Sequence, residues 1–125
     1  MYHLLIVAAG GAVGAALRHL VGLAALRLAG PTFPWGTLAV NLAGSFMMGV
    51  LIELLARKAG VSAEVRLFAA TGVLGGFTTF SAFSLDVVVL WERGALLAAA
   101  GYTLVSVVGA VAALFAGLAF VRALA

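Results

Sequence analysis

Polar side chains recur at helical spacing in two apolar stretches of this 125-residue sequence. Thr37, Asn41 and Ser45 are four residues apart, so on a helix they share one face over about 12 Å. Tyr102 and Ser106 repeat that spacing in a later stretch, where Ser106 lies the deeper of the two. Amide and hydroxyl groups donate hydrogen bonds, so such a row suits an anion that must shed water. The alternative is that these groups only hydrogen-bond neighbouring helices.

The stretch 72–84 mixes glycine, threonine, serine and phenylalanine inside an uncharged run. Two adjacent glycines and, soon after, two adjacent threonines are poor helix formers, so we expect a helix that breaks at residues 75–79. Backbone broken at membrane depth occurs only where protein buries it or where it lines a polar cavity. The stretch therefore predicts an interrupted helix that forms an ion site.

Phenylalanines recur every third residue from the expected break onward, at Phe77, Phe80 and Phe83. By default such a row faces lipid or packs in the core, but the edge of an aromatic ring carries partial positive charge and can stabilise an anion. Arg18 is a basic residue well inside an apolar segment. It either faces a vestibule or bonds to carbonyls that the broken helix frees, and snorkelling to the interface is the simpler alternative.

The composition places these residues in an integral membrane protein. Hydrophobic residues make up 66% of the chain and charged residues 9%, whereas soluble domains carry roughly 25% charged residues. Since a span needs about 20 residues, we expect one all-α domain with transmembrane helices near 3–28, 34–55, 67–91 and 95–121. The chain has no cysteine, and its carboxylates lie near segment ends, so we expect no enzyme. Its basic residues are scattered singly, which excludes a nucleic-acid surface.

Basic residues flanking the expected spans give a weak orientation signal. The side of the first residue holds four of them and the opposite side two; they are Arg57, Lys58, Arg66 and Arg122, against Arg27 and Arg93. A single orientation and insertion in both orientations, with antiparallel pairing, both remain open.

Small residues indicate where helices approach each other. They lie at Gly10 and Gly14 near the start and, on one face of the last span, at Gly101, Gly109, Ala113 and Gly117. Such faces allow close helix contact in lipid. Four short helices enclose little by themselves, so we expect a homodimer with two-fold symmetry to complete the polar pathway.

Three segments resemble the signatures of the Fluc (CrcB) fluoride channels. They are Gly10–Arg18 (GGAVGAALR), Gly36–Gly49 (GTLAVNLAGSFMMG) and Gly75–Phe83 (GGFTTFSAF). Their order and spacing match the family over essentially the whole chain. The resemblance implies passive, fluoride-selective conduction out of the cytoplasm, across the cell (inner) membrane, which limits fluoride toxicity. It also implies an antiparallel homodimer with dual topology and two pores.

The resemblance carries over residue by residue to the pore. It matches the fluoride path to Asn41, Phe80, Phe83, Ser106, Tyr102 and Arg18. The helical spacing worked out above adds Thr37 to this set. We therefore expect fluoride to pass along these seven side chains.

The resemblance further implies a sodium ion at the dimer interface, held by the backbone carbonyls of Gly75 and Thr78. Carbonyls at the end of a half-helix suit a hard cation, and the free amides of the next half-helix favour an anion. Two departures from the family pattern are His19, where tyrosine is common, and Ala82, where threonine is usual.

Two other functions compete with this interpretation. A small multidrug or guanidinium-type exporter shares the size and the four helices, but depends on a glutamate in its first helix. Residues 1–29 contain no acidic residue. A non-transporting subunit of a larger membrane complex would not need two aligned polar rows.

Overall fold

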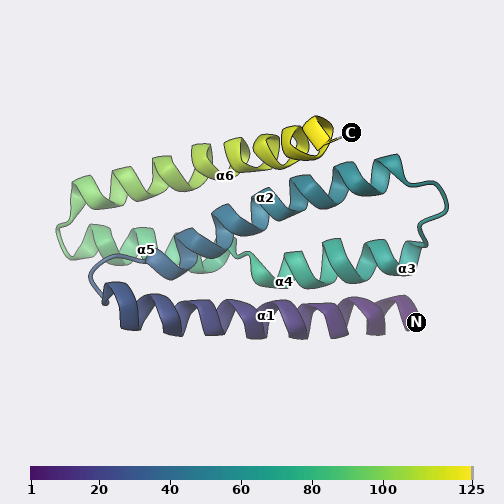
Figure 1. Ribbon diagram of the computed structural model, residues 1–125. Coiled ribbons are helices and arrows are strands. Elements are labelled where there is room, and N and C mark those ends of the chain that lie inside the picture. The colour runs from purple at the N-terminus through teal and green to yellow at the C-terminus, as the bar shows by residue number, and fades with distance from the viewer. Residues whose placement is uncertain (125) are drawn as a thin grey trace.

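The computed structural model describes residues 1–124, and its regular structure there is entirely helical (Figure 1). Three long helices are continuous: α1 (Tyr2–Ala29), α2 (Trp35–Arg57) and α6 (Leu96–Leu124). The remaining span is assembled from α3 (Ala63–Arg66), the π-helix η1 (Leu67–Leu74), α4 (Gly75–Phe77) and α5 (Phe80–Glu92). Within the described residues, four segments are long and apolar enough to cross a membrane, which confirms the predicted all-α, four-span architecture.

Short linkers reverse the chain between neighbouring spans. Across residues 1–124, positive φ angles occur at Gly30, Gly60 and Gly94, one in each linker. Glycine adopts this left-handed conformation without the steric penalty of a Cβ atom, so these glycines let each helix end and the chain turn back. Consequently the first residue, the α2–α3 linker and the C-terminal end of α6 lie at one end of the molecule (Figure 1).

Helix α2 crosses the middle of the molecule and packs on α6, while α1 packs along η1 and α4 (Figure 1). Glycines allow these close approaches. A Cβ atom at Gly49 of α2 would lie 3.0 Å from the Leu118 nitrogen of α6, and one at Gly10 of α1 would lie 2.6 Å from the Phe68 oxygen of η1. The predicted contact face is thus confirmed for α1. On α6, Gly117 makes such a contact with α2, whereas a Cβ atom at Gly101 would meet nothing within 4 Å in a single copy of the chain.

The helix break lies at Thr78 and Thr79, whose backbones are extended with φ/ψ of −87°/159° and −154°/123°. The break falls inside the predicted range 75–79, but the glycines themselves do not form it, because Gly75–Phe77 is helical. A Cβ atom at Gly76 would lie 2.6 Å from the carbonyl oxygen of Gly11. Gly76 therefore serves the close contact with α1.

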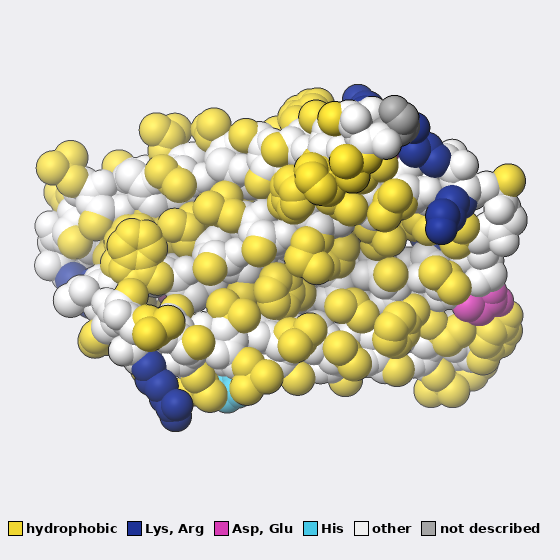
Figure 2. Space-filling view, viewed as in Figure 1, with side chains coloured by type: hydrophobic (Ala, Val, Ile, Leu, Met, Phe, Trp, Pro, Cys, Tyr) yellow, Lys and Arg dark blue, Asp and Glu magenta, His cyan; other side chains and the backbone are white. Residues whose placement is uncertain are grey.

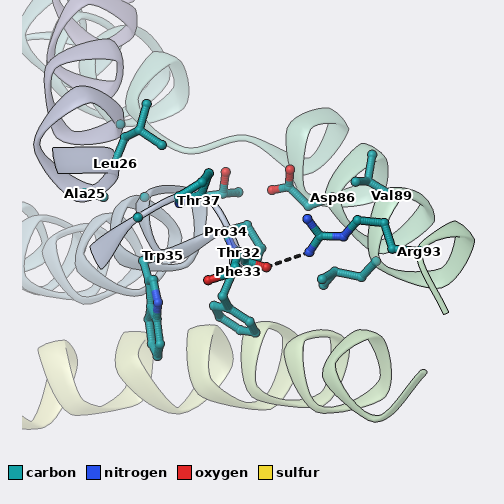
Figure 3. Close-up of a pocket in the computed structure, with 15 residues that line it drawn as sticks. Ala25, Leu26, Thr32, Phe33, Pro34, Trp35, Thr37, Asp86, Val89 and Arg93 are labelled. Atoms are coloured by element: carbon teal, nitrogen blue, oxygen red, sulfur yellow. Dashed lines mark hydrogen bonds between the residues drawn. The ribbon is translucent and has the colours of Figure 1, made fainter. Parts of the chain in front are cut away.

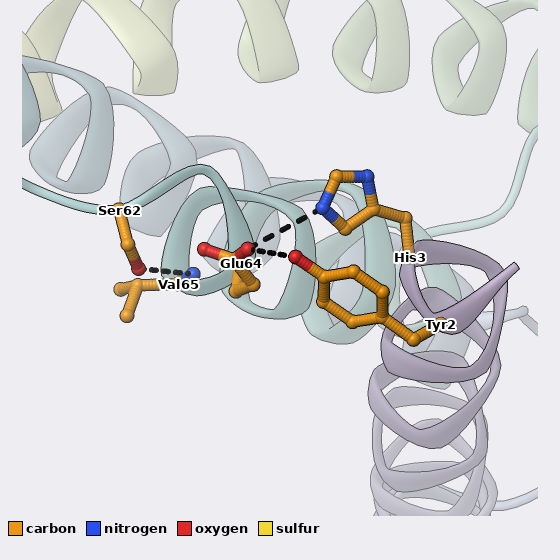
Figure 4. Close-up of polar contacts among 5 residues, drawn as sticks. All are labelled: Tyr2, His3, Ser62, Glu64 and Val65. Carbon is orange, nitrogen blue, oxygen red and sulfur yellow. Dashed lines mark hydrogen bonds and ion pairs between the residues drawn. The ribbon is translucent and has the colours of Figure 1, made fainter.

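The surface between the two ends of the molecule is dominated by hydrophobic side chains, and charged side chains gather at the ends (Figure 2). At the end that holds the first residue, the Tyr2 hydroxyl donates to the Glu64 carboxylate at 2.5 Å, and His3 Nε2 lies 3.4 Å from the same oxygen (Figure 4). The Ser62 hydroxyl accepts the Val65 N–H at 3.2 Å and caps α3 (Figure 4). These contacts tie the start of α1 to the start of the third span.

A second polar contact at that end joins α2 to α6. The Glu53 carboxylate accepts from Arg57 Nε and from Arg122 Nε, each at 3.1 Å. Helix ends are thus held by ionic contacts outside the apolar band, where water screens and solvates them.

Candidate functional site

The two threonines at the break leave the usual helical hydrogen-bond ladder. In an unbroken α-helix each N–H bonds to the carbonyl four residues earlier. Thr78 still follows this rule, since its N–H and its hydroxyl both donate to the Leu74 carbonyl, at 3.1 Å and 2.9 Å. Thr79 does not: its N–H donates to Asn41 Oδ1 at 2.8 Å, instead of to the carbonyl of Gly75. The break is therefore held from α2.

Side chains replace the other lost backbone partners. Arg18 Nε donates to the Gly76 carbonyl at 3.2 Å, and Asn41 Nδ2 donates to the Thr79 carbonyl at 3.0 Å. The Thr79 hydroxyl accepts the Ala82 N–H at 3.1 Å and caps α5. Of the roles that the sequence left open for Arg18, the structure shows the bond to a carbonyl freed by the break.

Two carbonyl groups at the break have no such replacement. Among the hydrogen bonds of residues 1–124, none ends on the carbonyl oxygen of Thr78. The N–H that would bond to the Gly75 carbonyl is held by Asn41. Within the same described range, no group of three or more His, Cys, Asp or Glu side chains could hold a metal ion. Carbonyl oxygens are the hard ligands that cations such as sodium and calcium accept, so these two atoms fit a cation better than any side-chain cluster does.

A cavity of about 310 Å³ lies beside Asn41, between α2, α5 and α6, and Thr78 and Thr79 of the break also border it. Its walls include Asn41, Ser45, Phe80, Phe83 and Ser106. The structure thus brings together four residues that the sequence analysis placed in the pore, although they come from three helices. Asn41 uses one of its two amide N–H donors on Thr79, which leaves one for a ligand.

Ser106 is the most informative of these residues. It is only 5% exposed, and its hydroxyl is the one buried side-chain polar atom in the described part of the chain that has no hydrogen-bond partner. A buried polar group without a partner costs about 1–3 kcal/mol. A ligand or water in the adjoining cavity would remove that penalty, so Ser106 marks the cavity as a polar site.

The two phenylalanines that the sequence analysis placed in the pore differ in exposure. Phe83 is buried in the core, whereas Phe80 is 75% exposed at the rim of the cavity. Their ring centroids lie 5.4 Å apart with the rings tilted by 47°. In a single copy of the chain the cavity is therefore open on the side of Phe80.

Thr37 and Tyr102 lie outside the lining of this cavity. Tyr102 is 1% exposed, and its hydroxyl donates to the Asp86 carboxylate at 2.9 Å. Thr37 and Asp86 line a separate chamber of about 280 Å³ at the end of the molecule that holds the α1–α2 linker (Figure 3). Arg93 also lines that chamber and donates from Nη2 to the Thr32 carbonyl at 2.6 Å (Figure 3).

Asp86 is a residue that sequence reasoning missed. It counted as one of the carboxylates near segment ends, yet it is half-buried and bonded to Tyr102. Its spacing of three residues from Phe83 places it on the same face of α5, and that spacing was the available signal.

Arg18 lines a third hollow, of about 310 Å³, between α1, α2 and the start of α5. His19, Thr79 and Ala82 also line it, so both departures from the family pattern gather in one place. No Asp or Glu of the described chain borders this hollow. The cationic side chain of Arg18 therefore gives it a positive potential.

Comparisons with known proteins cover nearly the whole chain. Residues 5–118 match a family described as CrcB-like protein, Camphor Resistance (CrcB). A protein of Mesorhizobium japonicum named "Fluoride-specific ion channel FluC" is 61% identical over 124 residues, which are 99% of each chain. Proteins of the same name from a Chelativorans species and from Agrobacterium fabrum are 64% and 61% identical, over 99% and 98% of each chain.

Proposed function

This chain belongs to the CrcB-like family, and from that membership we propose that it is a fluoride-specific ion channel. It is a multi-pass membrane protein whose relatives are channels rather than enzymes. Conduction is passive, so fluoride leaves the cytoplasm whenever its electrochemical potential there is the higher. We expect membrane lipid to contact the hydrophobic side chains that dominate the surface in Figure 2.

The observation that carries this proposal is the buried, unpartnered hydroxyl of Ser106 beside Asn41 and the two phenylalanines. A small anion entering the cavity would accept hydrogen bonds from Ser106 Oγ and from the free N–H of Asn41. The ring edges of Phe80 and Phe83 would add partial positive charge without offering a proton. Thr37, Tyr102 and Arg18 would act outside this cavity, in the end chamber and in the Arg18 hollow.

An antiparallel homodimer with dual topology belongs to the same proposal. In one copy the Phe80 ring stands 75% exposed at the edge of a polar cavity. A second copy packed against this side would shield the cavity from lipid and would cover the ring. Burying a phenylalanine side chain contributes about 1.5–3 kcal/mol.

We place a structural sodium ion at the carbonyls of Gly75 and Thr78. These oxygens fit the ion because neither is bonded to a donor within residues 1–124. When bound, the cation would neutralise partial negative charge at the end of the first half-helix and would hold two copies in register. The anion would contact other groups, Asn41 and Ser106, in the adjoining cavity.

Fluoride efflux from liposomes tests the function. Purified protein is reconstituted in vesicles loaded with potassium fluoride, and a fluoride electrode follows release after a potassium ionophore is added. We expect rapid fluoride release and little chloride release from matched vesicles loaded with potassium chloride. Release no faster than from protein-free vesicles would contradict the proposal.

The small multidrug-type exporter is the remaining alternative. It needs an acidic side chain in the first helix, and α1 has none in its 28 residues. A proton gradient would drive such an exporter but would leave a passive channel unaffected, so efflux measured with and without that gradient separates the two.

A further inference from the structure

The Asn41 side chain makes two hydrogen bonds with the backbone of a single residue. Its Oδ1 accepts the Thr79 N–H at 2.8 Å, and its Nδ2 donates to the Thr79 carbonyl at 3.0 Å. A primary amide offers a donor and an acceptor side by side, as a neighbouring β-strand does. Aspartate can accept but not donate when ionised, and leucine can do neither. Through its two hydrogen bonds, the Asn41 side chain thus pairs with the extended backbone of Thr79 as a neighbouring β-strand would.

The Thr79 N–H, which donates to Asn41, belongs to the same rigid peptide unit as the Thr78 carbonyl. The Thr78 C=O and the Thr79 N–H lie in one plane and, in a trans peptide, point in opposite directions. The structure contains only trans peptides in its described part. By holding the N–H, Asn41 turns the Thr78 carbonyl away from itself.

The same hydrogen bond also releases the Gly75 carbonyl. In a continuous helix the Thr79 N–H would bond to Gly75 O, four residues earlier. Asn41 Oδ1 takes that donor instead. Both carbonyls assigned to the cation thus depend on one interaction with α2: Gly75 is left unbonded by it, and Thr78 is oriented by it.

We propose that Asn41 is a positioning residue that couples the anion pathway to the cation site through the Thr78–Thr79 peptide. This inference rests on the proposed function for the identity of the two ions. A cation at the Thr78 oxygen polarises the peptide and strengthens its N–H as a donor to Asn41. The bound cation therefore holds the Asn41 side-chain amide in place, and the second N–H of that amide faces fluoride. Conversely, loss of the Asn41 amide weakens cation binding.

Sodium binding measured without any fluoride flux tests the coupling. The full-length wild type and Asn41→Leu are purified in a sodium-free buffer, and sodium chloride is titrated at constant ionic strength while the thermal unfolding midpoint is recorded. Sodium should raise the wild-type midpoint. For Asn41→Leu the sodium concentration at half-effect should be about tenfold higher, as expected for one lost hydrogen bond. An unchanged half-effect concentration would overturn the inference.

Ser106→Ala is the matched control, because Ser106 lines the same cavity but makes no hydrogen bond to the break. It should keep the wild-type sodium response. If Ser106→Ala shifts the response as much as Asn41→Leu does, the effect belongs to the cavity in general and the inference is wrong.

A second measurement needs no variant. Hydrogen exchange of the Thr79 amide in the wild type should slow on addition of sodium by more than exchange at Val65, whose N–H is also held by a side chain. Equal slowing at both amides would contradict the coupling. Failure of the wild type to pass fluoride would instead refute the proposed function, whereas a conducting wild type with no sodium response would refute the cation site and this inference with it.

Discussion

Replacing Gly14 by alanine tests whether the contact between α1 and the broken helix sets the position of the site. A Cβ atom at Gly14 would overlap the carbonyl oxygen of Val73 and would lie 2.8 Å from the Phe77 nitrogen. Both are backbone atoms, which cannot rotate away. Since favourable contacts between heavy atoms need about 3.5 Å, α1 must retreat by about 0.7 Å or more.

That retreat would also break a hydrogen bond one turn further along α1. Arg18 Nε lies 3.2 Å from the Gly76 oxygen, and a further 0.7 Å or so would take it beyond hydrogen-bonding distance. Overpacking costs about 1–3 kcal/mol and the lost charged hydrogen bond about 1.5–3 kcal/mol. Alanine in place of glycine within a helix stabilises the folded protein by about 0.5–1 kcal/mol through its higher helix propensity. We therefore expect Gly14→Ala to be less stable by about 2–5 kcal/mol.

Thermal unfolding in detergent and fluoride efflux from liposomes are the two assays. The midpoint should fall by at least about 6 °C, and efflux should slow because the start of the break has moved. Gly11→Ala is the control on the same helix, since a Cβ atom there would meet nothing within 4 Å. Gly11→Ala should match the wild type or exceed its stability slightly. A Gly14→Ala protein with a wild-type midpoint and wild-type flux would refute the packing argument.

Two further substitutions probe the polar groups. Asn41→Asp places a carboxylate in the cavity and removes the donor to the Thr79 carbonyl, so fluoride efflux should fall by about tenfold or more; near-normal efflux would remove Asn41 from the pore. Tyr102→Phe removes the hydroxyl that donates to Asp86 at 2.9 Å, and thermal unfolding should show a loss of about 1.5–3 kcal/mol; unchanged stability would mean that water replaces this hydroxyl.

Much of the fold could be predicted because it follows from composition and spacing. The apolar fraction and the span lengths indicated four membrane helices, and the run of poor helix formers located the break to within five residues. Helical spacing also predicted that Asn41 shares a face with Ser45, and both line the same cavity. Periodicity is a property of one helix, so it can be read from one segment.

Contacts between helices could not be read in this way. The glycines of the stretch 72–84 were expected to break the helix, but Gly76 is helical. It must be glycine because a Cβ atom there would collide with the Gly11 carbonyl of α1. The hydrogen bond between Tyr102 and Asp86 joins α6 to α5 across 16 residues of chain, and no local sequence pattern predicts it. The π-helix η1 likewise has no sequence signature that we recognised.

Residue types and their spacing therefore determined that this protein spans the membrane and that its third span is interrupted. They also predicted which side chains could meet an anion. Only the tertiary structure decided that two threonines form the break and that Asn41 holds the second of them. The physical reason is that a broken helix leaves backbone donors and acceptors that must be satisfied inside the membrane. The partners of Gly76 and Thr79 come from α1 and α2, more than 30 residues away along the chain, and are brought within reach only by helix packing.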